Sequence, residues 1–392
     1  MSFWQRSSRK TLVQQPATVF CDGHADEVPH FLSTFGVSLL HRECCQRPKE
    51  NVFISPISVF LALAMTENGA AGATKAVIRK ALALPTDIGE KAVNESTVAL
   101  LKSLRSQSGI ELTIATALWT NIGLAIANEF VWKCQEIYDA SVTSLDFKQP
   151  STAAAINKWV AEKTSGKILE IVTVESVADL PTIITNAIYF KARFLHPFTK
   201  NETQFRDFCL ASGRKKSVPM MRQSELSGAY RFGKQFEAAA LHYADSTFVL
   251  FLLLPEKGVN PEEVLTEESL PDLFVKRGSV ELDLSVPRFT TEFSSQLKES
   301  LKHMGMGIAF EYPGADFSAM GSQSLFIGEM LHKTLLQVDE EGTIAAAATT
   351  AMVELCALMP QQETLVFDRP FAVVMMDSAT RVMIFAGVVY EP

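Results

Sequence analysis

The chain has 392 residues, of which 47% are hydrophobic and 20% are charged. This composition is typical of globular proteins and excludes an intrinsically disordered chain. The formal net charge of −8 argues against nucleic acid as a partner, because phosphate binding needs a basic face, and no apolar run in the sequence reaches the length of a membrane span.

Residues 1–27 are predicted to form a polar extension, and residues 28–392 a single domain. The basic start of the extension is not followed by the apolar core of a secretory signal. The six cysteines are irregularly spaced and form no Cys-x-x-Cys pair, which indicates free thiols in a reducing compartment. We therefore expect a cytoplasmic protein, with non-classical export to the extracellular space as the alternative.

Helical patterns dominate the first half of the chain. Apolar residues recur at helical spacing over residues 29–41. A strongly apolar helix over 56–70 ends at the turn signal Asn68-Gly69. Further helices are predicted over 71–84 and over 151–171, the second of them amphipathic and ending near Gly166-Lys167.

Strand patterns dominate the second half. Apolar runs predict strands over 180–189, 247–254 and 280–286, the last with the alternation of a half-buried strand. Two more runs, 372–376 and 382–389, are separated by a hairpin-like connection. Because helices come mostly early and strands mostly late, the predicted class is α+β rather than repeating βαβ units.

The segment from Glu340 to Ala351 has an unusual composition for an exposed stretch. An acidic pair and Gly342 are followed by small or β-branched residues, and no charge or proline occurs between Gly342 and Val353. Exposed loops are usually polar and rich in turn-forming residues. The composition suits a strand that later becomes buried in a sheet, and an alanine-rich helix or spacer is the alternative from the residues alone.

Catalytic signatures are missing from the sequence. It contains no Gly-x-Ser-x-Gly, no His-Glu-x-x-His and no phosphate-binding loop. We therefore expect a protein that is not an enzyme and that has no cofactor and no metal site.

A series of short blocks follows residue 28 in a fixed order. They begin with Asn51-Val52-Phe53-Ile54-Ser55-Pro56-Ile57-Ser58 and close with Phe367-Asp368-Arg369-Pro370-Phe371 and Phe385-Ala386-Gly387. Between these lie residues 157–168, 185–191, 198–221, 287–289 and 314–318. In this order the blocks, together with the Glu340–Ala351 segment, resemble the serpin family of serine protease inhibitors.

The resemblance implies a fold of about nine helices around three β-sheets, with a large central sheet and an exposed reactive-centre loop at about residues 340–364. It implies a monomeric, irreversible suicide-substrate inhibitor that forms a covalent complex with its target protease. The cleaved loop would then insert into the central sheet as a new strand. The alternatives are a non-inhibitory serpin-like binding or chaperone protein and an inhibitor of a cysteine protease.

The resemblance also implies site residues in the loop. The reactive bond would be Cys356–Ala357, with Leu355 as the alternative P1 residue, which suits a serine protease of elastase- or chymotrypsin-like specificity. The hinge residues would be Glu340, Glu341, Gly342, Thr343, Ala345, Ala346, Ala347 and Ala348.

Two further clusters are implied below the loop. Ser55, Ser58, Asn186 and His332 match the family's shutter, a buried polar cluster beneath the central strands. Phe194 and Arg288 match its breach, where the loop begins to insert, and Arg288 is expected to pair with Glu340. Phe194 departs from the family's usual tryptophan, and Thr116 replaces a common asparagine.

Overall fold

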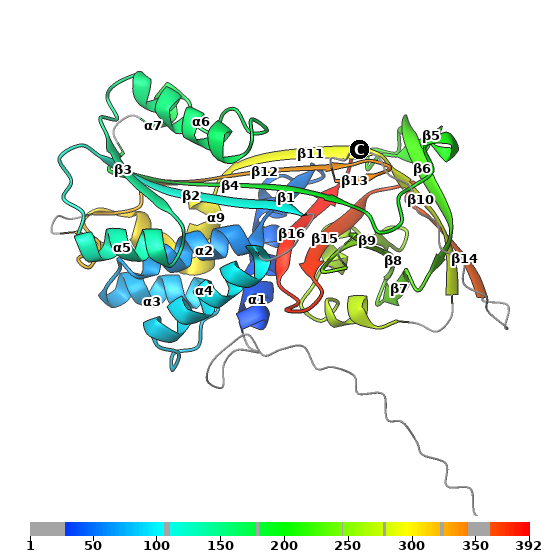
Figure 1. Ribbon diagram of the computed structural model, residues 1–392, viewed down its shortest axis with the longest axis horizontal. Helices are drawn as coiled ribbons and strands as arrows, with labels where there is room; N and C mark the ends of the chain where they lie inside the picture. The colour runs from blue at the N-terminus through cyan, green and yellow to red at the C-terminus, as the bar shows by residue number, and fades with distance from the viewer. Residues whose placement is uncertain are drawn as a thin grey trace, which may run out of the picture.

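The computed structural model describes residues 28–105, 110–177, 180–244, 246–276, 280–321, 325–343 and 361–392. Within these ranges the chain forms nine α-helices and three β-sheets, two of six strands and one of four (Figure 1). The predicted α+β architecture of about nine helices around three sheets is therefore confirmed.

The central sheet holds long strands in the order β11-β12-β4-β2-β3. Their bounds are Phe289–Gln296 for β11, Glu329–Val338 for β12, Thr182–Arg193 for β4, Glu111–Asn121 for β2 and Ser141–Leu145 for β3. β12 and β4 pair in parallel, whereas β11 with β12 and β2 with β4 pair antiparallel. A two-residue strand, β13 (Gly342–Thr343), also pairs with β4.

Three strands of the second sheet are buried along their whole length, which explains their near-continuous apolar runs. Its strand order is β1-β16-β15-β9-β8-β7. The bounds are Val52–Ile54, Met383–Val389, Phe371–Asp377, Phe248–Pro255, Phe236–His242 and Tyr230–Gly233, in that order. The predicted strand at 247–254 and the predicted hairpin at 372–389 both belong to this sheet.

The third sheet has the order β14-β10-β6-β5 and lies at one end of the molecule (Figure 1). Its strands are Gln361–Val366, Val280–Pro287, Lys215–Ser227 and Gln204–Cys209. β14 begins with the last residues of the predicted reactive-centre loop and pairs in parallel with β10, so this sheet holds the loop's far end.

Helices cover both faces of the central sheet. One face carries α6 and α7, and the other faces α1 to α5 (Figure 1). The helices are α1 Val28–Gln46, α2 Pro56–Glu67, α3 Gly72–Ala81, α4 Glu90–Arg105, α5 Asn128–Glu136, α6 Ser151–Lys163, α7 Val174–Val177, α8 Pro261–Val264 and α9 Lys298–Leu301. Short 3-10 or π turns occupy Lys200–Glu202, Pro271–Phe274, Lys302–Met306 and Gly307–Phe310.

The predicted bounds of α6 were too long. The helix ends at Lys163, a few residues before the predicted end near Gly166-Lys167. Ser165 and Gly166 have positive φ values of 52° and 72°, a left-handed conformation that ends helices. The chain after α6 is held instead by Asn157, whose amide oxygen accepts hydrogen bonds from the backbone of Ile171 and Val172.

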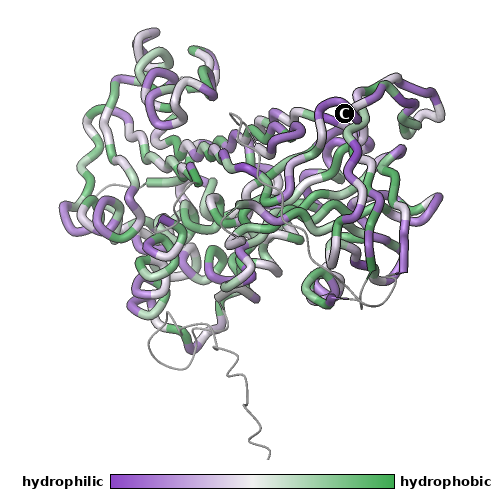
Figure 2. Tube along the Cα trace, turned by 45° about the vertical axis from the view of Figure 1, so that its right-hand side comes forward, coloured by the Kyte–Doolittle hydropathy of each residue, from purple (hydrophilic) through white to green (hydrophobic). Residues whose placement is uncertain are grey.

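Two hydrophobic clusters sandwich the central sheet. The larger one includes Ile184 and Ile188 of β4 with the second sheet and helices α1 and α2, and the smaller one joins Ile183 and Ala187 of β4 to Ile156 of α6. Hydrophobic segments accordingly gather in the strands, and hydrophilic ones follow the periphery (Figure 2). None of the helices in the described ranges is long and apolar enough to cross a bilayer.

Candidate functional site

The parallel pair β12–β4 closes the middle of the central sheet. Its register extends from Glu329 opposite Ile183 to Leu335 opposite Tyr189. Beyond this point β4 continues to Arg193, while β12 continues against β11 as far as Val338 opposite Phe289. The two strands thus separate at one end, and the sheet has an opening there.

The hinge strand β13 occupies this opening. Gly342 lies opposite Arg193 and Thr343 opposite Ala192, antiparallel to β4. Gly342 has a φ of +142°, a conformation that side chains disfavour. A Cβ at this position would lie 2.5 Å from the backbone oxygen of Ala192 and 2.7 Å from the backbone nitrogen of Phe194. Only glycine allows the chain to turn this close to β4.

Thr343 is anchored beneath the opening. Its side chain is fully buried, and its hydroxyl shares a 2.9 Å hydrogen bond with the hydroxyl of Tyr243. The Tyr243 ring in turn stacks on Phe194, with 5.1 Å between the ring centroids. Phe194, the expected breach residue, is therefore in the hydrophobic wall directly behind the hinge.

Glu340 fixes the start of the hinge by charge and hydrogen bonding. Its carboxylate pairs with the guanidinium of Arg288 and accepts a 2.7 Å hydrogen bond from Thr203. Burial opposes ionisation of Glu340, but the hydrogen bonds from Arg288 and Thr203 outweigh it and lower the pKa of the carboxyl group. Glu340 is thus held as a carboxylate on the chain that leads into β13.

Backbone hydrogen bonds join the hinge to the chain that follows β4. Phe194 N–H donates to the oxygen of Glu341 at 3.0 Å, and Phe198 N–H donates to the oxygen of Glu340 at 2.7 Å. The Glu341 side chain also forms an ion pair with Lys200. The hinge is therefore held against the chain after β4, at Phe194 and Phe198, beside the opening in the sheet.

The four expected shutter residues form one buried cluster, and each side chain is fully buried. Ser58 Oγ donates to Asn186 Oδ1 at 2.7 Å, and Asn186 Nδ2 donates to the Ser58 carbonyl at 3.0 Å. Ser55 Oγ donates to the carbonyl of Ile384 at 2.7 Å. The cluster joins α2 to β4 and β12, so a separation of these strands must rearrange it.

His332 links Ser55 to Asn186 through its two ring nitrogens, and these two hydrogen bonds fix its protonation state. Its Nε2 lies 3.0 Å from the backbone N–H of Ser55 and must accept, while its Nδ1 lies 2.8 Å from Asn186 Oδ1 and must donate. The ring is therefore neutral with the proton on Nδ1. Burial lowers the pKa of His332 to about 3.

Two residues that contact the shutter cluster or the hinge could not be identified from local sequence patterns. Thr116 Oγ1 accepts a hydrogen bond from Asn186 Nδ2 at 3.1 Å, so this replacement of a common asparagine keeps a polar partner in the cluster. Tyr243 was not predicted at all. Its partner Thr343 is 100 residues away in the sequence, and no local pattern indicates such a contact.

The remaining predicted loop residues lie outside the described residues. These are the reactive bond Cys356–Ala357, the alternative P1 residue Leu355, and Ala345, Ala346, Ala347 and Ala348.

Comparisons with known proteins agree with this geometry. The family model described as "Serpin (serine protease inhibitor)" matches residues 31–392. Serpin B9 of Homo sapiens is 31% identical and leukocyte elastase inhibitor A of Rattus norvegicus 32% identical, and the matches cover 90% and 92% of this chain and 96% and 98% of those proteins. The structure of the thermophilic serpin tengpin in its native state has a TM-score of 0.86 at 28% identity and covers 95% of this chain and 96% of that one.

Proposed function

This chain belongs to the serpin family, and we propose that it is an irreversible suicide-substrate inhibitor of a protease. Residues 28–392 are the serpin domain, and residues from about 340 to 364 are the reactive-centre loop. The observation that carries the proposal is the hinge strand β13, which pairs with β4 at the open end of the central sheet.

The register of β13 favours insertion along the whole of β4. Gly342 and Thr343 lie opposite Arg193 and Ala192, so each later loop residue would pair with one earlier residue of β4. Continued in this way, Val353 would lie opposite Thr182, the first residue of β4. Cys356 is three residues farther along the chain, so cleavage there would free a segment that matches the length of the strand.

The side chains of this segment suit the inserted state. Thr343 points into the core, and side chains alternate between the faces of a sheet. In an inserted strand, every second residue after Thr343 would point to the same face as Thr343. These residues are Ala345, Ala347, Thr349, Ala351 and Val353. These side chains are small or β-branched and uncharged, so none would bring an unpaired charge into the core, which costs several kcal/mol.

The chemistry is that of an interrupted proteolysis. The serine hydroxyl of the protease attacks the P1 carbonyl, the peptide bond to P1′ breaks, and the new amine of P1′ takes a proton and leaves with the C-terminal fragment. An ester between protease and P1 remains. Insertion must carry this ester away before water hydrolyses it, so the inhibitor depends on the speed of strand addition.

Cys356 is the proposed P1 residue and Ala357 the P1′ residue, with Leu355 as the alternative P1. A small apolar P1 suits an elastase-like protease, and leucine suits a chymotrypsin-like one. No arginine or lysine occurs between Val353 and Met359, which disfavours trypsin-like targets.

The second candidate is a non-inhibitory serpin-like protein, and inhibition of a cysteine protease is a variant of the first. The absence of charge and proline from Gly342 to Val353 argues against the non-inhibitory candidate. We propose a monomer in a reducing compartment such as the cytoplasm. In the part of the chain that the structure describes, Cys44, Cys45, Cys134 and Cys209 are free thiols, which fits such a compartment.

The test is incubation with purified elastase-, chymotrypsin- and trypsin-type serine proteases and a papain-type cysteine protease. We expect a complex that survives SDS with an elastase- or chymotrypsin-type enzyme. Mass spectrometry of the released C-terminal fragment identifies the bond: a fragment that begins at Ala357 supports Cys356 as P1, and one that begins at Cys356 supports Leu355.

The variant Cys356→Arg is the matched control, because it changes P1 specificity and leaves the hinge sequence intact. We expect it to form the stable complex with the trypsin-type enzyme instead. Cleavage within the loop by every protease, without any stable complex, overturns the inhibitory proposal.

A further inference from the structure

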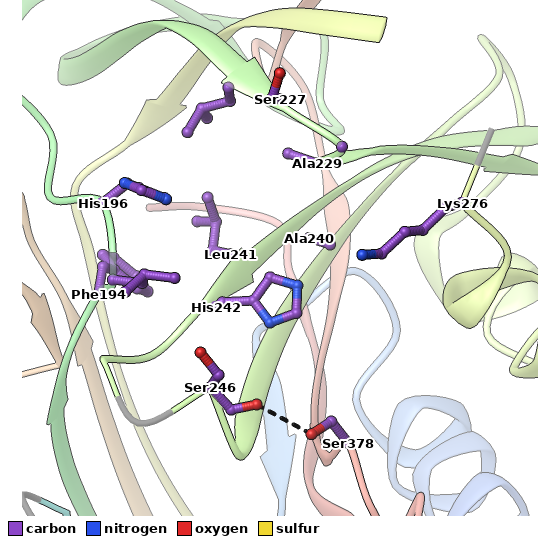
Figure 3. Close-up of a pocket in the computed structure, with 13 residues that line it drawn as sticks. Phe194, His196, Ser227, Ala229, Ala240, Leu241, His242, Ser246, Lys276 and Ser378 are labelled. Atoms are coloured by element: carbon purple, nitrogen blue, oxygen red, sulfur yellow. Dashed lines mark hydrogen bonds between the residues drawn. The ribbon is translucent and has the colours of Figure 1, made fainter. Parts of the chain in front are cut away.

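A cavity of about 380 Å³ lies behind the hinge, between the chain that follows β4 and the ends of β6 and β8 (Figure 3). This volume is within the range of small-molecule sites, roughly 300–1,000 Å³. One wall is formed by Phe194, Leu195 and His196 and another by Ala240, Leu241 and His242. Lys276 closes a third side. Apart from Phe194, none of the hinge and shutter residues described above lines this cavity.

The cavity combines an apolar lining with basic groups. Leu226, Ala229 and Leu241 supply buried apolar surface. His196 and Lys276 reach towards the same space from opposite sides, and the His242 ring lies between them (Figure 3). Among the described residues that line the cavity, none is acidic.

Charged groups around the cavity add to this excess of basic over acidic side chains. Behind the cavity the Arg231 guanidinium is buried, where it donates to the carbonyls of Leu273, Gly228 and Tyr230. Burial first, and then the positive charges of Arg231, Lys276 and His196, hold the pKa of His242 below its usual range. Among the described residues, the charges that act on the His242 ring are therefore basic, which favours an anion in the cavity.

We propose that this cavity is a binding site for a small organic anion with an apolar body, such as an aryl or alkyl carboxylate or sulfonate. The apolar body packs on Leu226, Ala229 and Leu241, and the anionic group lies between His196 and Lys276. The hydroxyls of Ser227 and Ser246, which also line the cavity, are further donors for its oxygens.

The location couples this site to the hinge. The backbone N–H of Leu195 donates to His242 O at 2.8 Å, while the neighbouring Phe194 N–H donates to Glu341 O of the hinge at 3.0 Å. The same two segments therefore form the cavity wall and hold the hinge. We extend the proposal accordingly: the anion binds with different affinity before and after loop insertion, which is the condition for it to influence insertion. This second half rests on the proposed function.

The probe for the site is 8-anilino-1-naphthalenesulfonate, titrated into the full-length protein and followed by fluorescence. We expect one saturable site per chain. The double variant His196→Glu with Lys276→Glu is expected to weaken binding at least tenfold. Both side chains are exposed, so these changes spare the core. Lys276→Arg, which keeps the charge, is expected to bind within threefold of the wild type.

Two matched controls locate the interaction. Lys234→Glu reverses an exposed charge at the other end of the β7–β8 hairpin, roughly 20 Å away by strand rise, and is expected to change affinity less than twofold. N-phenyl-1-naphthylamine has the same rings without the sulfonate and is expected to bind at least tenfold more weakly. Equal affinity of the two probes, or equal effects of the charge reversals at the two places, overturns the anion site.

The coupling is tested by a second titration after the reactive loop has been cleaved. We expect the dissociation constant of the sulfonate probe to change at least threefold in a cleaved form whose thermal midpoint has risen. An unchanged constant in that form overturns the coupling. If cleavage does not raise the thermal midpoint, the loop has not inserted, and both the proposed insertion and its coupling to the anion are contradicted. The comparison of the charge variants still decides whether the anion site exists.

Discussion

Thr343 shows how much a single position can decide in this molecule. It follows the pivot Gly342 directly, its side chain is fully buried, and its hydroxyl bonds to Tyr243. In the insertion that we propose, the residues after Thr343 pair in turn with earlier residues of β4, so Thr343 is the first buried side chain of the new strand. A side chain that the core cannot accept at position 343 therefore stops the process at its first step.

We expect Thr343→Arg to convert the protein from an inhibitor into a substrate of its target protease. A guanidinium at this buried position has no partner, and burying an unpaired charge costs several kcal/mol. Hydrolysis then outruns insertion. The measurement is the fraction of reacted protein that migrates as an SDS-stable complex, which should fall at least tenfold.

Thr343→Val is the matched control, because it keeps the β-branched shape and removes only the hydroxyl. It leaves Tyr243 without this partner, at a cost of about 1–3 kcal/mol of stability, and we expect it to retain the stable complex. Loss of the complex in the valine variant as well would show that the hydroxyl, rather than charge burial, controls insertion.

His332 makes the stability of the molecule depend on pH. Its pKa is about 3 in the folded chain and 6.5 in the unfolded chain, so below pH 6.5 the unfolded state takes up a proton that the folded state does not. This contribution to stability is complete above pH 6.5 and is lost as the pH falls towards 3. Between pH 7 and pH 5 we expect it to lower the free energy of unfolding by about 2 kcal/mol.

The measurement is urea unfolding at both pH values for the wild type, for His332→Gln and for His303→Gln, a change at an exposed histidine. The pH-dependent loss should shrink by about 2 kcal/mol in His332→Gln alone. Because each protein is compared with itself, a general loss of stability in a variant does not affect the result. An unchanged pH dependence in His332→Gln would exclude the neutral, buried histidine described above.

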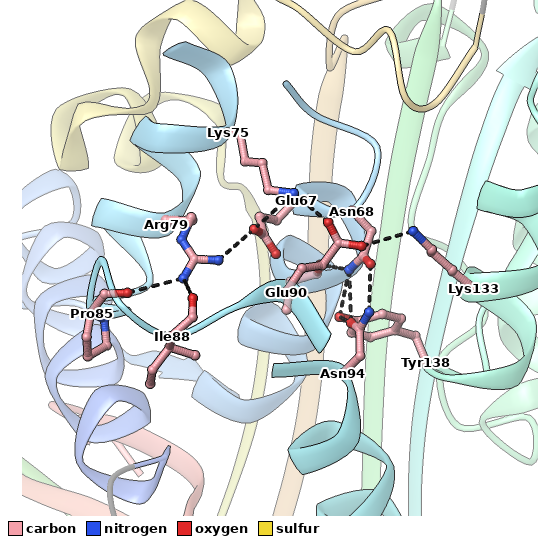
Figure 4. Close-up of polar contacts among 11 residues, drawn as sticks. Glu67, Asn68, Lys75, Arg79, Pro85, Ile88, Glu90, Asn94, Lys133 and Tyr138 are labelled. Carbon is pink, nitrogen blue, oxygen red and sulfur yellow. Dashed lines mark hydrogen bonds and ion pairs between the residues drawn. The ribbon is translucent and has the colours of Figure 1, made fainter. Parts of the chain in front are cut away.

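Elements are tied together by polar contacts as well as by the core, most clearly where α2, α4 and α5 meet (Figure 4). Asn68 at the end of α2 and Asn94 of α4 exchange hydrogen bonds of 3.1 and 2.8 Å. Tyr138, just after α5, donates to Asn94 Oδ1 at 2.6 Å and accepts from Asn68 at 3.0 Å. Glu90 of α4 pairs with Lys133 of α5 beside them. The buried amide of Asn94 is thus committed within the fold, although Asn94-Glu95-Ser96 matches an N-glycosylation pattern.

We expect Tyr138→Phe to destabilise this junction. The phenol oxygen is lost, and Asn68 and Asn94 keep buried polar atoms with one partner fewer, which costs about 1–3 kcal/mol. Denaturant unfolding measures the change, and Tyr312→Phe at an exposed tyrosine is the control. A difference below 0.5 kcal/mol between the two variants would contradict the structural role of the cluster.

The whole molecule is built around the central sheet, into which we propose that one more strand inserts. The parallel contact of β12 with β4 closes the sheet, and the proposed insertion replaces it with two antiparallel contacts. The proposed insertion involves the whole molecule, because the buried polar cluster below β4 and β12 and the helix α6 above them must both move when these strands separate.

We therefore expect cleavage within the loop to raise the thermal midpoint by about 10 °C. An added strand makes about ten net backbone hydrogen bonds at about 1 kcal/mol each, and for a chain of this length each kcal/mol raises the midpoint by about 1 °C. Differential scanning calorimetry before and after cleavage gives the value. The Thr343→Arg variant, cleaved in the same way, is the control and should show a smaller rise.

Many elements of this protein could be predicted from the sequence, because the spacing of apolar residues depends on local secondary structure and burial. Periodicity indicated α2, β9 and the β15–β16 hairpin, and composition marked Gly342 and the small residues after it as a segment suited to burial. The ordered blocks were specific enough to indicate the family and four residues that the structure brings together in one buried polar cluster. Bounds were less certain. Gly166 indicated where α6 ends, but the helix stops at Lys163, and no pattern in the sequence indicates the positive φ of Ser165.

Only the tertiary structure decided what these residues contact. The opening between β12 and β4, the register of Thr343 against Ala192, and the support from Tyr243 and Phe194 all join segments that are distant in the sequence. The same is true of the basic cavity behind the hinge, whose lining comes from separate stretches of the chain. The sequence alone determined which segment is suited to insert, because that depends on the size and charge of successive side chains. Where it would insert, and what holds it until then, depends on pairing between distant strands.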